Sequence, residues 1–250
     1  MSRVQSIERA FAGLGALADG PIGVTEVAER VALPKSTAAR LLGSLVREGA
    51  VEQVPGDTRY RLGPRMTALA VPGGSIVSVA RPFLEALAGD VGEAIGLSVA
   101  DGRDVRYVDQ VSVAHEVQVR DWTGTRAPMH TVSSGLVFLA HLPESTLDAF
   151  LARPLEALTS HTVTDPAALQ ERLLVVRRDG FAWVRDEFAD GISSVAAPIS
   201  DPWGGVLAAV HVHGPSYRFP AAGREDEVAR RVVVTAGRIA QRLRRAGQGG

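Results

Sequence analysis

The 250-residue sequence has no cysteine, and only 5% of its residues are aromatic. It also has no apolar run as long as a membrane helix needs, which is about 18 residues. Without cysteine there is no disulfide, no thiolate metal site and no cysteine nucleophile, and nothing calls for an oxidising compartment. A basic and then apolar leader is also missing from the first residues. We therefore expect a cytoplasmic protein with no membrane partner.

Charge is nearly balanced, with 27 basic and 28 acidic residues and a net charge of −1. The balance is uneven along the chain, because residues 33–65 hold six basic residues against three acidic ones. A local positive surface of this kind favours contact with nucleic acid, although it is modest. The length and the 46% hydrophobic content suffice for two domains of ordinary size.

The most informative stretch is Leu33 to Gly49, which has the pattern of a DNA recognition helix. Pro34 suits a first turn and Gly49 suits a left-handed stop, so both ends are marked. One face carries apolar residues at helical spacing and the other carries small polar and basic ones. The predicted packed face consists of Ala38, Leu41, Leu42, Leu45 and Val46, and the opposite face of Ser36, Thr37, Arg40, Ser44 and Arg47.

The segments on either side complete a winged helix-turn-helix. A short helix over 26–32 precedes the recognition helix, and a hairpin with strands over 50–54 and 59–62 follows it. An ordinary packing helix is the alternative, but it does not explain this conjunction of neighbours. The predicted DNA-contacting residues are Lys35, Ser36, Thr37, Arg40 and Ser44 on the helix and Arg59 and Arg61 on the wing.

The remaining pattern predicts a supporting helix from Val4 to Leu17, a short helix over 65–71, and a helix from Ser75 to Leu87 interrupted at Pro82. The second half mixes strands and helices. Strands are expected over 94–100, 105–111, 193–200 and 206–213, and helices over 137–142, 147–151, 166–180 and 221–245. The resulting α+β architecture has a DNA-binding domain over 1–64, a jointed helical linker over 65–90 and a further domain over 91–250.

Several motifs together resemble the isocitrate lyase regulator (IclR) family of bacterial transcription factors. They are Val4 to Ala10, Leu33 to Ala38, Gly49 to Glu52, Tyr60 to Gly63, Pro128 to His130, Thr164-Asp165, Glu187, Val195 to Pro198 and His213 to Pro215. The resemblance implies a GAF-like effector-binding domain with an antiparallel sheet, assembly into homodimers or homotetramers, and no cofactor. It also implies repression of catabolic genes under the control of a small carboxylate, through operator DNA with an approximate inverted repeat. Activation by the effector is the alternative sign.

The departures from the family pattern concern the effector. Leu136 follows Gly135 where a lysine is usual, Val184 replaces an aspartate, and His211-Val212-His213 replaces a serine pair. Strand alternation places both histidines on one face, where imidazoles that titrate near neutral pH can donate to a carboxylate, amide or phenol. We expect an aromatic acid, or its amide or hydrazide. The predicted effector-binding residues are His130, Ser133, Ser134, Gly135, Val184, Ile192, Ser194, His211 and His213.

Three alternatives concern the same residues. The histidine pair could form only hydrogen bonds to neighbouring loops, or it could bind a metal ion with His130 as the third ligand. A hydrolase with an accessory DNA-binding domain is a different class, suggested by Ser133-Ser134-Gly135 beside His130. It lacks a Gly-x-Ser-x-Gly elbow and a placed acid, and Asp186 and Glu187 would point to opposite faces of a strand. We expect no catalytic residue and no metal site.

Overall fold

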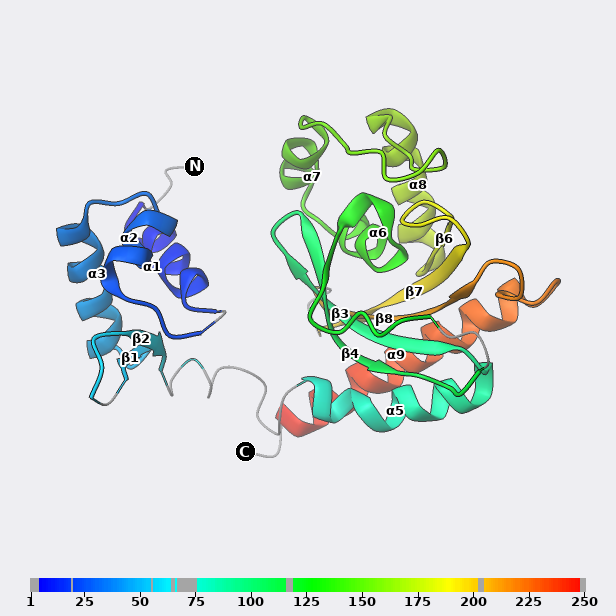
Figure 1. The fold of residues 1–250 in the computed structure, drawn as a ribbon, viewed down its shortest axis with the longest axis horizontal. Helices are drawn as coiled ribbons and strands as arrows, with labels where there is room; N and C mark the ends of the chain where they lie inside the picture. The colour runs from blue at the N-terminus through cyan, green and yellow to red at the C-terminus, as the bar shows by residue number, and fades with distance from the viewer. Residues whose placement is uncertain are drawn as a thin grey trace. The chain divides into compact units, whose positions relative to one another are not determined.

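The structure, a computed structural model, describes residues 5–18, 20–54, 56–63, 66, 76–115, 119–201 and 205–247. The chain divides into two compact units, Met1–Pro72 and Gly73–Gly250 (Figure 1). The helix expected over 65–71 lies almost entirely outside the described residues. The α+β class expected from the sequence is confirmed.

The N-terminal unit contains three helices followed by a two-stranded hairpin. These elements are α1 (Gln5–Ala16), α2 (Val24–Arg30), α3 (Lys35–Arg47), β1 (Val51–Gln53) and β2 (Tyr60–Leu62). The strands pair antiparallel, and the backbone of Tyr60 also forms hydrogen bonds with the backbone of Ile22, which precedes α2. The apolar face of α3 packs inward as expected, with Ala38, Leu42 and Leu45 buried. The hairpin after α3 is the expected wing.

Helix α3 stops where the sequence marks a stop. Gly49 has φ +69°, and the amide of Ala50 donates to the carbonyl of Leu45 over 2.9 Å. The amide of Gly49 donates in turn to Val46 O over 2.9 Å, so the last carbonyls are satisfied as in a Schellman motif. One expectation is wrong: Val46 is 39% exposed, because it lies at the margin of the packed face, whereas Leu45 in the same turn is buried.

The C-terminal unit is built on a six-stranded antiparallel sheet in the order β5-β4-β3-β8-β7-β6. The strands are β3 (Ala94–Asp101), β4 (Asp104–Val111), β5 (Arg126–Pro128), β6 (Ala182–Arg185), β7 (Ile192–Ser200) and β8 (Val206–Pro215). The hairpin of β3 and β4 and the pair of β7 and β8 form where they were expected. The edge strands β5 and β6, of three and four residues, were not predicted.

Helices cover both faces of this sheet (Figure 1). Helices α5 (Ile76–Val91) and α9 (Glu225–Gly247) pack on one face. The other face carries η1 (Met129–Thr131), α6 (Ser133–Ala140), α7 (Glu144–Leu151) and α8 (Pro166–Asp179). Strand β8 is therefore buried on both sides from residue 208 to 215.

Helix α5 runs without interruption through Pro82, contrary to the expected break. The buried residues Ala80, Leu84, Leu87 and Ala88 continue on one face across the proline, while Pro82 itself is exposed. Packing of this face against the sheet and α9 outweighs the single helical hydrogen bond that proline cannot donate. Among the described helices, none has the length and apolar character needed to cross a bilayer.

Candidate functional site

The polar face of α3 is open to solvent in its first three turns. Lys35, Ser36, Arg40 and Ser44 are exposed, and Thr37 is half-buried. The hydroxyl of Ser44 is already engaged within the helix, since it donates to Arg40 O and accepts from Arg47 Nη2, each over 3.0 Å. Lys35, Ser36 and Arg40 are thus the side chains of this face best placed to reach a groove of DNA.

A basic residue from another helix joins this face. Arg9 of α1 lines a surface groove of about 240 Å³ together with Thr37, Arg40 and Ser44. Arg9 was not among the predicted DNA-contacting residues, because it lies far from α3 along the chain and only the packing of α1 on α3 brings it there. No local pattern signals such a residue.

The two arginines of the wing both have acidic partners within the wing. Arg59 Nε lies 2.6 Å from Asp57 Oδ2, and Arg61 Nε lies 2.6 Å from Glu52 Oε1. The hydrogen bond from the Arg59 side chain is the main reason why the pKa of Asp57 is below its usual range. Both pairs are exposed, so each arginine can exchange its carboxylate for a phosphate, but the positive charge of the wing is partly offset.

The C-terminal unit brings most of the predicted effector residues to one small cavity. Those that line it are Ser133, Ser134, Val184, Ile192, Ser194, His211 and His213. The cavity has a volume of about 30 Å³, roughly the share of one water molecule. The side chains that close it from the other sides are Tyr107, Trp122, Val132 and Phe188.

The aromatic wall of this cavity was not predicted from the sequence. Trp122 and Phe188 meet edge to face with ring centroids 5.3 Å apart, and Tyr107 lies 6.5 Å from Trp122. These residues come from β4, from the loop before β5 and from the segment after β6, so no single pattern joins them. Burial raises the pKa of Tyr107, which is therefore a neutral phenol.

The two histidines stand side by side on β8. Their ring centroids are 5.4 Å apart at an interplanar angle of 29°, and Tyr107 contacts His211 edge-on at 5.2 Å. Gly96 is the register partner of His211 on β3, and a Cβ there would lie 2.3 Å from Nε2 of that ring. The absence of a side chain at position 96 therefore makes the room for His211.

Burial keeps both imidazoles neutral. It lowers the pKa of His213 to about 4, opposed only by the nearby carboxylate of Asp121, and lowers the pKa of His211 well below its usual value, with help from His213. The expectation of a titration near neutral pH is thus wrong. Nδ1 of both rings and Nε2 of His213 are buried and have no hydrogen-bond partner among the described residues. A neutral imidazole carries one N–H donor, so His213 buries an unsatisfied donor.

Two predicted effector residues lie apart from this cavity wall. His130 is buried, and its Nε2 is 2.8 Å from the carbonyl oxygen of Glu156, so it holds a neighbouring loop. Gly135 lies where α6 crosses η1, and a Cβ there would be 2.1 Å from the carbonyl oxygen of Met129. The close packing of α6 against η1 therefore explains why a glycine stands at position 135.

The residues that suggested catalysis have other partners. Ser133 Oγ donates to Ser194 Oγ over 2.9 Å, and Glu187 pairs with Arg172 at 2.7 Å. Asp186 Oδ1 accepts from the amide of Gly191 and from the hydroxyl of Ser216, each over 2.8 Å. Among the residues described, no group of three or more His, Asp or Glu side chains could hold a metal ion.

A helix-turn-helix unit with an exposed polar helix face, joined to a unit with a buried polar cavity, is the construction of a ligand-responsive transcriptional regulator. Two family models match the chain: the IclR helix-turn-helix domain over residues 6–55 and the bacterial transcriptional regulator IclR C-terminal domain over 68–241. The chain belongs to the IclR family of bacterial transcriptional regulators.

Relatives extend over most of the chain. The HTH-type transcriptional regulator Rv1719 of Mycobacterium tuberculosis is 36% identical over 90% of this chain and 87% of its own length. The transcriptional repressor IclR of Escherichia coli is 30% identical over 87% and 82%. Among solved structures, an IclR homolog from Microbacterium hydrocarbonoxydans complexed with 4-hydroxybenzoate superposes with a TM-score of 0.61, at 28% identity over 96% of this chain and 99% of that one. Proteins of this family bind operator DNA and small effectors, and many are repressors.

Proposed function

We propose that this chain represses a catabolic operon, and that an aromatic acid, or its amide or hydrazide, releases it from the operator. The DNA-contacting side chains are those of the exposed face of α3, with Arg9, Arg59 and Arg61 on phosphates. In a homodimer the two recognition helices enter successive major grooves about 34 Å apart, so the operator is an approximate inverted repeat.

The observation that carries the effector proposal is the buried histidine pair at the cavity wall, in which Nδ1 of both rings and Nε2 of His213 find no hydrogen-bond partner among the described residues. An unsatisfied buried donor costs about 1–3 kcal/mol, and a ligand that accepts its hydrogen bond recovers that free energy. Because both rings are neutral, they offer donors and acceptors rather than positive charge. A phenol, amide or hydrazide satisfies both kinds of nitrogen.

An aromatic effector has to widen the cavity, because about 30 Å³ is far below the roughly 300 Å³ of small-molecule sites. Trp122 and Phe188 are the side chains to move, since they lie in loops while the histidines and serines lie on β7, β8 and α6. The effector then binds the conformer with the widened cavity more tightly than the conformer with the small one. If the two conformers also differ in affinity for the operator, a coupling free energy of about 1–3 kcal/mol between effector and DNA suffices for regulation. The relative with bound 4-hydroxybenzoate supports an aromatic ligand of this size.

A gel shift tests both halves of the proposal. The DNA is the region beside the protein's own gene, with a shuffled duplex of equal length as control, and the panel holds 4-hydroxybenzoate, 4-hydroxybenzamide, 4-hydroxybenzhydrazide and pyruvate. We expect a specific shift that an aromatic compound reverses and pyruvate does not. A shift strengthened by the compound would make the protein an effector-dependent activator or a co-repressed regulator. An equal shift of the shuffled duplex would refute specific binding to an operator in this region.

Three variants test which residues contact the operator and which contact the effector. Arg40→Ala should weaken specific binding about tenfold or more with unchanged thermal stability, while Arg177→Ala, an exposed arginine on α8, should leave binding as it is. A double variant, His211→Ala with His213→Ala, should still bind the operator and no longer respond to the aromatic compound. An unchanged response in that variant would remove the histidine pair from the effector site.

A further inference from the structure

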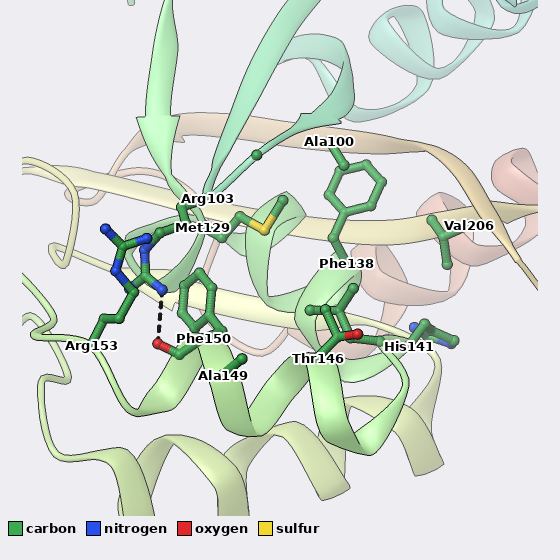
Figure 2. A pocket seen from close by; sticks show the side chains of 12 residues that line it. Ala100, Arg103, Met129, Phe138, His141, Thr146, Ala149, Phe150, Arg153 and Val206 are labelled. Atoms are coloured by element: carbon green, nitrogen blue, oxygen red, sulfur yellow. Dashed lines mark hydrogen bonds between the residues drawn. The ribbon is translucent and has the colours of Figure 1, made fainter. Parts of the chain in front are cut away.

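A second cavity in the C-terminal unit lies apart from the histidine pair. It has a volume of about 320 Å³ and lies between the turn joining β3 and β4, helix α6 and helix α7 (Figure 2). This volume is about ten times that of the cavity at the histidines and reaches the range of small-molecule sites. None of the residues predicted for the effector or for DNA lines it.

Two arginines stand together at one side of this cavity. Arg103 comes from the turn between β3 and β4, and Arg153 follows the end of α7 (Figure 2). Their charges are close enough that Arg153, after burial, helps to lower the pKa of Arg103, against a weaker opposite influence of Asp104. Within the part of the chain that the structure describes, neither guanidinium has a carboxylate at ion-pair distance.

Arg103 is held in a fixed orientation. Its Nη1 donates to the carbonyl oxygen of Phe150 over 2.8 Å, and its Cζ lies 3.9 Å from the centroid of the Phe150 ring. The amide of Met129 donates to the carbonyl oxygen of Arg103 over 3.0 Å, which fixes the turn itself. The remaining guanidinium nitrogens are thus presented to the cavity without a large cost in side-chain entropy.

Away from the arginines the wall is apolar. Met129, Phe138 and Phe150 are buried side chains that face the cavity, and Val206 closes the side opposite the arginines (Figure 2). Arg153 is exposed and Arg103 is half-buried, and an anion between them would offset the repulsion of the two like charges while its apolar body covers the wall. This combination of groups matches a carboxylate at one end and a hydrocarbon body along the wall.

We propose that this cavity is a second ligand site, which binds a monocarboxylate with an apolar body. The carboxylate accepts hydrogen bonds from Arg103 and Arg153, and the body packs along Met129, Phe138 and Phe150. The site is independent of the effector cavity, because no residue lines both.

Methionine provides a direct probe of the site. The chain has three methionines, Met1, Met66 and Met129, and only Met129 lies in the C-terminal unit. In the full chain labelled with [¹³C-methyl]methionine, titration with hexanoate should shift the Met129 signal saturably. Hexan-1-ol, which has the same body without the charge, should bind at least tenfold more weakly.

Variants separate this site from other causes of a shift. Arg153→Gln should weaken hexanoate binding about three- to tenfold, and Arg177→Gln, the same change on α8, should not. Thr146→Trp fills the cavity from α7 and should abolish the shift, whereas His213→Gln should preserve it. The proposal is overturned by an unmoved Met129 signal, by equal affinity for hexan-1-ol, by equal affinities of the two glutamine variants, or by loss of binding in His213→Gln. None of these results depends on the DNA assay.

Discussion

The buried neutral histidines make the stability of the C-terminal unit depend on pH, and His213→Gln tests this. In the unfolded chain His213 has its ordinary pKa of 6.5, and in the folded chain burial lowers the pKa to about 4. Below pH 6.5 the unfolded state therefore binds more protons than the folded state. The free energy of unfolding falls as the pH drops from 6.5 towards 4 and is unaffected by this group above that range.

The two pKa values fix the size of the effect. Between pH 7.5 and pH 5, a group with these values lowers the free energy of unfolding by about 2 kcal/mol. With a urea m-value of about 2 kcal/mol per molar, the urea midpoint of the wild type should fall by about 1 M more than that of His213→Gln. His211 changes in the same direction, so the double variant should retain still less of the pH dependence.

Tryptophan fluorescence follows the appropriate unit, because Trp122, Trp183 and Trp203 all lie in residues 73–250. Urea titrations at the two pH values should be run on the wild type, on His213→Gln and on His161→Gln, which alters an exposed histidine. The His161 variant should behave as the wild type does. Parallel pH dependence of the wild type and His213→Gln would mean that burial does not hold His213 neutral. The histidine pair would then not present the neutral donors and acceptors proposed for the effector.

Three further outcomes follow from particular contacts. Asp57→Asn removes the acidic partner of the wing arginine Arg59, so affinity for the operator should rise. In a titration with salt, the slope of log affinity against log salt concentration should steepen by about one counterion. An unchanged slope would mean that the wing does not contact phosphates. Gly135→Ala places a Cβ against the backbone of Met129 and should lower the free energy of unfolding by at least about 2 kcal/mol in thermal melts. Gly89→Ala, which has open space on α5, should raise it by up to about 1 kcal/mol. Equal melting temperatures of the two variants would contradict this. Glu93→Gln removes the buried carboxylate that Arg218 now holds at 2.6 and 3.0 Å, and should cost about 1–3 kcal/mol in the same melts; an unchanged melting temperature would show that a neutral amide replaces the carboxylate without loss.

Local signals were enough for much of the fold. Asp165 and Pro166 begin α8 as expected, with the Asp165 side chain accepting from the amide of Ala168 over 2.8 Å, and Gly49 ends α3. Such caps act within one turn of chain, so the sequence carries them directly. Pro82 misled the prediction, because the break it favours is opposed by tertiary packing that no local window contains.

The sequence by itself determined that His211 and His213 share a face of one strand, since side chains alternate along any strand. Tertiary structure alone decided what that face meets. The aromatic wall of Tyr107, Trp122 and Phe188 comes from three separate segments, and together with the start of α6 it buries the imidazoles and keeps them neutral. The cavity at Arg103 and Arg153 arises in the same way, because alternation and capping act over a few residues whereas burial and charge proximity depend on which distant segments pack together.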